Sequence, residues 1–114
     1  MNWYPVCPFD RLPVERAVCV LVAGEQIALV RTRSDVVHAV DNFDPVGGAM
    51  VMSRGIVGSR GQTDVLVSPL HKQSYDLTTG QCLDLPKVFL TVHEVRVVDG
   101  NVEVGLAQAV RRLA

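Results

Sequence analysis

Apolar residues recur along this chain in short runs, and clusters of Gly, Pro, Asp and Ser separate the runs. Runs this short and this rich in Val favour β-strands over helices. Several short strands with turn signals between them predict an all-β fold, either an antiparallel barrel or a sandwich. The strands are expected at residues 3–6, 17–23, 26–32, 36–40, 56–58, 65–67, 73–76, 91–98 and 102–105.

Two pairs of these runs are typical of β-hairpins. Gly24-Glu25 separates the runs at 17–23 and 26–32, and Asp99-Gly100-Asn101 separates the last two runs. Single helical turns are expected within residues 8–16 and 49–53. Leu106, Val110 and Leu113 have helical spacing, which predicts a short helical tail over 106–114.

The stretch from residue 41 to 64 differs from the rest of the chain. It is rich in Gly, shows little periodicity and is long for a connection. Long irregular connections in a compact domain are usually either functional or disordered. This stretch is therefore a candidate for a functional loop.

A second irregular stretch begins after the apolar run at 65–67, where Pro69 lacks the N–H that strand pairing needs. Ser68-Pro69-Leu70-His71 is followed by Tyr75-Asp76 and then by a turn at Gly80. This pattern resembles the second cluster-binding loop of the Rieske iron–sulfur fold, which reads Cys-x-x-His before an aromatic-Asp-x-x-x-Gly hairpin. The first Rieske loop, Cys-x-His, then corresponds to residues 41–45.

The resemblance implies a cluster that has been lost. It places the four ligand positions at Asn42, Asp44, Ser68 and His71, and only His71 is a ligand residue of the Rieske type. A Rieske centre needs two thiolates on one iron and two imidazoles on the other. Because Asn42 and Ser68 cannot supply thiolates, no metal is expected in this chain. Asn42 and Ser68 could instead hydrogen-bond to each other across the gap.

Within Rieske-like proteins, the chain resembles the small subunit of assimilatory NAD(P)H-dependent nitrite reductase. The features that carry this resemblance are Asp44-Pro45, the segment 52–56 and the segment 68–73. It implies an oxidoreductase subunit without catalytic residues or cofactors of its own. The partner would be the large catalytic subunit, which carries FAD, an iron–sulfur cluster and siroheme and reduces nitrite to ammonium.

Length and charge agree with a single globular unit. The 114 residues are enough for one domain, expected over 1–114 with its core at about 3–105. The net charge of −1 and the scattered Lys and Arg argue against nucleic-acid binding and against a basic membrane patch. No apolar run approaches the ~20 residues of a membrane span. The N-terminus lacks the pattern of a signal peptide, so a cytoplasmic protein is expected.

The cysteines and two of the histidines favour structural roles. Cys7, Cys19 and Cys82 are odd in number and far apart, which argues against a disulfide scaffold or a zinc site and favours a reducing compartment. His38 and His93 lie in predicted strands, where they would be structural or surface groups.

Three further hypotheses concern the two irregular stretches. Asp41 and Asp44 could form an acid pair, although an Asp before a proline is more often a turn residue. Asp44 and His71 could hold a single metal ion, but no third ligand is evident. Arg54, Lys72 and His71 are candidates for contact with a partner, since Arg is favoured at interfaces and loops on a rigid scaffold commonly bind.

Two other functions remain as alternatives. One is a Rieske-type ferredoxin that transfers electrons in an oxygenase, which the missing thiolates disfavour. The other is an independent small-molecule-binding barrel, which would need an apolar cavity.

Overall fold

The computed structural model describes residues 2–107 of the chain. Within them the fold is all-β, as predicted, and the helical segments are two single 3-10 turns. The elements are β1 (Trp3–Pro8), η1 (Phe9–Arg11), β2 (Arg16–Val22), β3 (Glu25–Arg31), β4 (Val37–Asp41), η2 (Met52–Arg54), β5 (Ile56–Arg60), β6 (Thr63–Val67), β7 (Ser74–Asp76), β8 (Val92–Val98) and β9 (Asn101–Gly105).

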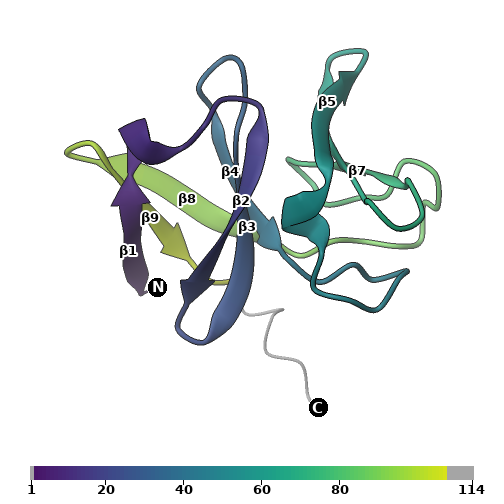
Figure 1. Ribbon diagram of the computed structural model, residues 1–114, viewed down its shortest axis with the longest axis horizontal. Coiled ribbons are helices and arrows are strands. Elements are labelled where there is room, and N and C mark those ends of the chain that lie inside the picture. The colour runs from purple at the N-terminus through teal and green to yellow at the C-terminus, as the bar shows by residue number, and fades with distance from the viewer. Residues whose placement is uncertain (1, 108–114) are drawn as a thin grey trace.

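The strands form two antiparallel sheets (Figure 1). The larger sheet has the order β1-β9-β8-β4-β3-β2, and the smaller sheet has the order β5-β6-β7. The outer strands β1 and β2 of the larger sheet also contact each other, so this sheet curls toward a barrel. The antiparallel barrel or sandwich predicted from the sequence is therefore confirmed.

Both predicted hairpins are present, and each has a two-residue turn with positive φ at both positions. β2 and β3 are joined at Ala23-Gly24, with φ of 48° and 84°, and β8 and β9 at Asp99-Gly100, with φ of 50° and 79°. Two consecutive residues with positive φ are typical of the type I′ turn, whose twist matches that of the flanking strands.

Two hydrophobic cores lie on opposite faces of β3. Ile27 and Leu29 point into the curled larger sheet and pack with residues such as Val102. Ala28 and Val30 point the other way, toward the smaller sheet, and join a second cluster. Successive side chains alternate between faces, so a strand buried on both faces must be apolar throughout, as residues 27–30 are.

Most expected elements differ from the structure by only one or two residues. The helical turn expected within 49–53 is the 3-10 turn η2, and the one expected within 8–16 is η1. The predicted helical tail over 106–114 lies almost wholly outside the described residues. Within residues 2–107, no helix is long and apolar enough to cross a membrane.

Candidate functional site

Two irregular loops meet where the sheets adjoin. The first loop (residues 42–55) follows β4 of the larger sheet, and the second loop (residues 68–73) joins β6 to β7 in the smaller sheet. The Ser68 hydroxyl donates a hydrogen bond of 2.5 Å to Asp44 Oδ2, and neither side chain is exposed. A bond of this length is typical of a hydroxyl donating to a carboxylate. A polar contact between the loops thus exists, and it is made by Asp44 and Ser68.

The other oxygen of the Asp44 carboxylate closes a turn in its own loop. Asp44 Oδ1 accepts hydrogen bonds of 2.9 Å from the backbone N–H groups of Val46 and Gly47, so the predicted role as a turn residue is confirmed. Burial alone would raise the pKa of Asp44. The bonds from Gly47, Ser68 and Val46, together with the charge of His71, outweigh burial and hold this pKa below its usual value.

The second loop is folded around Ser68. The Ser68 hydroxyl accepts a hydrogen bond of 3.2 Å from Leu70 N. The backbone carbonyl of Ser68 accepts one of 3.2 Å from Lys72 N. Lys72 has φ of 64°, which is uncommon for a residue with a side chain. Ser68 N donates to Gln73 O at 2.9 Å and closes the loop. The backbone of this loop is therefore fixed by bonds within it.

Asn42 is oriented differently from the prediction. Its amide nitrogen donates to Gln26 Oε1 at 3.0 Å, and its amide oxygen accepts from Ser53 N at 2.7 Å. The polar contact between the loops is made by Asp44 and Ser68, so the hypothesis that Asn42 bonds to Ser68 is corrected. Asn42 fixes the start of the first loop to the β2–β3 hairpin and to η2, which lies near the end of the same loop.

Tyr75 was not predicted as a site residue. Its side chain lies wholly buried in the core between the sheets, and its hydroxyl has no hydrogen-bond partner within the described part of the chain. Burial, and then the nearby charges of Asp44, Cys82 and Asp84, raise the pKa of Tyr75 to about 12. The sequence did contain a signal, because Tyr75 is the aromatic residue of the hairpin pattern after the second loop.

The predicted partner-contact residues lie on the surface of these loops. Arg54, His71 and Lys72 are all exposed. Neither Arg54 nor Lys72 takes part in an ion pair among residues 2–107. Within that part of the chain, their charges are therefore available for contact with a partner.

Asp41 belongs to another network. Its carboxylate lies 2.9 Å from Nε2 of the buried His93, and Nδ1 of His93 accepts a hydrogen bond from Ala107 N at 3.0 Å. This network ties β8 to the end of β4 and to the segment after β9. Asp41 bonds to His93 and Asp44 bonds to Ser68, so the two carboxylates belong to separate networks and the hypothesis of an acid pair is corrected. The structural role predicted for His93 is confirmed.

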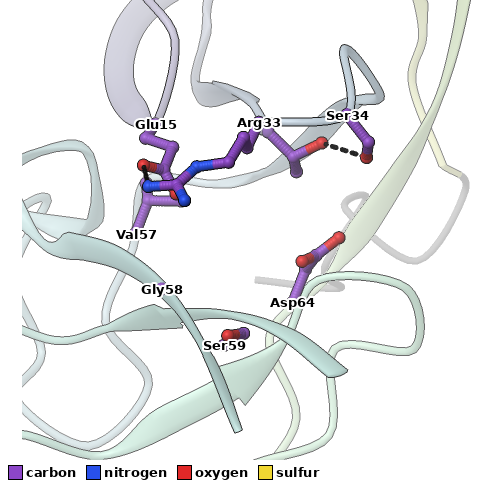
Figure 2. Close-up of a pocket in the computed structure, with 8 residues that line it drawn as sticks. Glu15, Arg33, Ser34, Val57, Gly58, Ser59 and Asp64 are labelled. Atoms are coloured by element: carbon purple, nitrogen blue, oxygen red, sulfur yellow. Dashed lines mark hydrogen bonds and ion pairs between the residues drawn. The ribbon is translucent and has the colours of Figure 1, made fainter. Parts of the chain in front are cut away.

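A separate cleft of about 440 Å³ lies between the two sheets on another part of the surface. Figure 2 shows residues of the β3–β4 region on one side and residues of β5 and β6 on the other. The cleft is lined by Glu15, Thr32, Arg33, Ser34, Val57, Gly58, Ser59 and Asp64. Glu15 and Arg33 form an ion pair of 2.8 Å beside it. The cleft is polar, unlike the apolar cavity that a small-molecule-binding barrel would need.

The residues of the two loops do not fit a Rieske cluster. Such a cluster needs two thiolates and two imidazoles. Cys7 and Cys19 lie in β1 and β2, and Cys82 is buried in the core, so no thiolate comes from either loop. Within residues 2–107, no three His, Cys, Asp or Glu side chains converge as a metal site requires. Asp44 and His71 therefore find no third ligand of these types.

Comparisons with known proteins agree with this fold. Residues 2–105 match the family of Rieske-like [2Fe-2S] domains. The nitrite reductase (NADH) small subunit of Escherichia coli K12 is 35% identical over 103 residues, which are 90% of this chain and 95% of that protein. A crystal structure of the proposed NADH-dependent nitrite reductase small subunit of Mycobacterium tuberculosis is 45% identical, with a TM-score of 0.88 over 93% of this chain and 96% of that one.

A third relative is a large subunit, of which only a small part matches this chain. A nitrite reductase [NAD(P)H] large subunit of Klebsiella oxytoca is 34% identical over 110 residues, which are 96% of this chain but only 11% of that protein. A domain similar to this chain is thus part of that large subunit. Taken with the fold and the two loops, these similarities show that the chain belongs to the Rieske-like family of nitrite reductase (NADH) small subunits.

Proposed function

We propose that this chain is a cluster-less small subunit of cytoplasmic NAD(P)H-dependent nitrite reductase, and that it supports the large catalytic subunit in the assimilatory reduction of nitrite to ammonium. The similarity to nitrite reductase small subunits over nearly the whole chain carries the proposal. The hydrogen bond between Ser68 and Asp44 supports the absence of a cluster, because it joins the two loops that resemble the cluster-binding loops of a Rieske domain. The FAD, iron–sulfur cluster and siroheme belong to the large subunit in this proposal, and the small subunit contributes no redox centre.

The geometry also supports a different assignment of the lost ligands. The two thiolates of a Rieske centre bind the same iron, so their positions must be adjacent in space. Asp44 and Ser68 are adjacent, whereas the Asn42 side chain is held by Gln26 and Ser53. We therefore assign the thiolate positions to Asp44 and Ser68. The Cys-x-His spacing then places the first imidazole position at Val46, and three of the four ligands are still missing.

The main alternative is a Rieske-type ferredoxin of an oxygenase. That function requires a cluster that accepts and releases an electron. The side chains at the four assigned ligand positions are a carboxylate, a hydroxyl, a valine and one imidazole. Carboxylate and hydroxyl oxygens are hard ligands and do not replace the soft thiolates of an iron–sulfur cluster. The loop chemistry thus favours the subunit function.

The test combines the metal content of the chain with its effect on the large subunit. We expect the purified chain to be colourless and iron-free, even after anaerobic reconstitution with iron and sulfide. We expect the large subunit to reduce nitrite with NAD(P)H better when this chain is present. Two irons per chain with a Rieske-type EPR signal would support the ferredoxin instead. Failure to bind the large subunit and to change its activity would contradict the subunit function.

A further inference from the structure

Large apolar side chains are exposed on the two loops and on the neighbouring segment 85–90. Val46 is 38% exposed, Leu70 47%, Met50 48% and Phe89 56%. Single exposed apolar residues are normal on a soluble protein, but a group of them in one place marks a site of interaction. We call these four residues the tip patch.

Contacts between neighbours make the tip patch continuous. Gly47, next to Val46, lies against Leu70, because a Cβ on Gly47 would come within 2.6 Å of Leu70 Cδ1. Met50 pairs with Phe43 in an isolated β-bridge. Phe43 and Pro45 in turn line a small hollow together with Phe89. The patch therefore spans the first loop, the second loop and the segment before β8.

Basic side chains are exposed in the same three segments, at Arg54, Lys72 and Lys87. The acidic residue within these segments, Asp44, is buried and hydrogen-bonded to Ser68, and Asp84, which precedes the third segment, is paired with Arg60. We take the three basic residues as the rim of the patch. An apolar centre with a charged rim is the usual anatomy of a protein interface. The complementary surface has an apolar centre and acidic residues around it.

The loops that carry the tip patch are fixed before any partner binds. The bond between Ser68 and Asp44 joins them, and the turns at Asp44 and Ser68 hold the backbone on either side of Val46 and Leu70. A surface that is already ordered loses less entropy on binding than a mobile one. This favours use of the patch for binding.

We infer that the tip patch docks on an apolar surface of the nitrite reductase large subunit that is rimmed by acidic residues. The inference rests on the proposed function and adds the surface that is used. In the Klebsiella oxytoca relative, a domain similar to 96% of this chain is part of the large subunit itself. In that protein the domain is linked covalently to the rest of the large subunit, so the two meet at high effective concentration. The rest of the large subunit is therefore the partner that we infer for this domain. The same partner fits the separate chain.

The test compares substitutions in the tip patch with one at the other end of the molecule. Leu70→Asp and Phe89→Asp place a charge in the apolar centre and should each weaken binding to the purified large subunit at least tenfold. Val97→Asp is the matched control. Val97 is 48% exposed in β8, near the β8–β9 turn that lies far from β5 and β7 (Figure 1). It should bind within twofold of wild type.

Folding and charge need separate variants. Leu70 packs against Gly47, so thermal melting must accompany each titration, and Phe89→Ser and Leu70→Ser replace any aspartate variant that melts early. Lys72→Glu should weaken binding severalfold and most strongly at low salt, because it repels an acidic rim. An unchanged or higher affinity of Lys72→Glu for the large subunit would contradict the acidic rim.

Three outcomes would overturn the inference. If wild type binds the large subunit and all folded tip variants bind equally well, docking occurs elsewhere, while the proposed function stands. If the tip variants abolish self-association and leave binding to the large subunit intact, the patch is covered by a second copy of this chain. If wild type does not bind the large subunit at all, the proposed function fails, and the docking surface fails with it.

Discussion

At the scale of single residues, Asp44 is a buried carboxylate whose two oxygens accept hydrogen bonds from both loops. One carboxylate oxygen closes a turn in the first loop, and the other accepts the Ser68 hydroxyl from the second loop. A buried carboxylate is costly unless hydrogen bonds satisfy it. Three donors do so here, and for this reason the carboxylate of Asp44 is stable in the interior.

The charge of Asp44 should make the stability of the protein depend on pH. Its pKa in the folded state lies below the value of about 3.9 expected when unfolded. The stabilisation is therefore fully present above about pH 4, and it is lost as pH falls through the folded-state pKa. We expect Asp44→Asn to lower the free energy of unfolding by about 1–3 kcal/mol at pH 7. The difference from wild type should shrink below pH 4.

Urea unfolding between pH 7 and pH 2.5 measures this difference. Asp10→Asn is the control, because Asp10 is exposed in η1 and should change stability by no more than about 0.5 kcal/mol. A difference between Asp44→Asn and wild type that stays constant over the whole range would contradict the role of the charge.

At the scale of elements, the strands could be predicted and the loops could not. Alternating and continuous apolar runs located β3 and the two hairpins, because side-chain periodicity is a local property of the chain. The path of the first loop depends on distant partners. Asn42 bonds to Gln26, which lies 16 residues earlier, and Asp44 bonds to Ser68, which lies 24 residues later. The spacing of residues within the loop contains no signal for either contact.

This difference leads to a prediction about the ligand positions. The variant Asp44→Cys, Val46→His, Ser68→Cys restores the ligand set in the assignment that the structure supports. The variant Asn42→Cys, Asp44→His, Ser68→Cys restores it in the assignment from sequence. Both keep His71. We expect the first to take up iron on anaerobic reconstitution and to give a Rieske-type EPR signal. We expect the second to take up little or none, since metal sites tolerate only small errors in ligand distance.

Iron content and the EPR spectrum, with wild type as the blank, decide between the two assignments. Melting curves of both variants without metal show whether each is folded before reconstitution. Equal iron uptake by the two variants, or greater uptake by the Asn42→Cys variant, would refute the assignment of the thiolate positions to Asp44 and Ser68.

At the scale of the whole molecule, an apolar core holds the two sheets together. Met52, Leu66, Leu77 and Leu90 lie wholly or almost wholly buried between them. His38 of β4 is half-buried, and its Nε2 has no partner among the described residues. The sequence placed His38 in a strand but could not show that it faces the smaller sheet, because that depends on how the sheets pack.

His38 should therefore make the association of the sheets sensitive to pH. Burial lowers the pKa of His38 below its usual value of about 6.5, and the charges of Asp64 and Asp76 and the Leu77 backbone offset this only in part. Below about pH 6.5 the unfolded chain takes up a proton more readily than the folded protein. The stability that His38 contributes is then fully present above pH 6.5 and falls as pH drops toward the folded-state pKa. His38→Gln and His38→Phe cannot take up this proton, so both should lose less stability than wild type between pH 8 and pH 5.

Urea unfolding at four pH values in this range measures the effect. The two replacements differ in size and polarity, so a pH effect common to both reports the loss of the proton and not a change in packing. A decline with pH as steep in both variants as in wild type would show that His38 is not the group responsible.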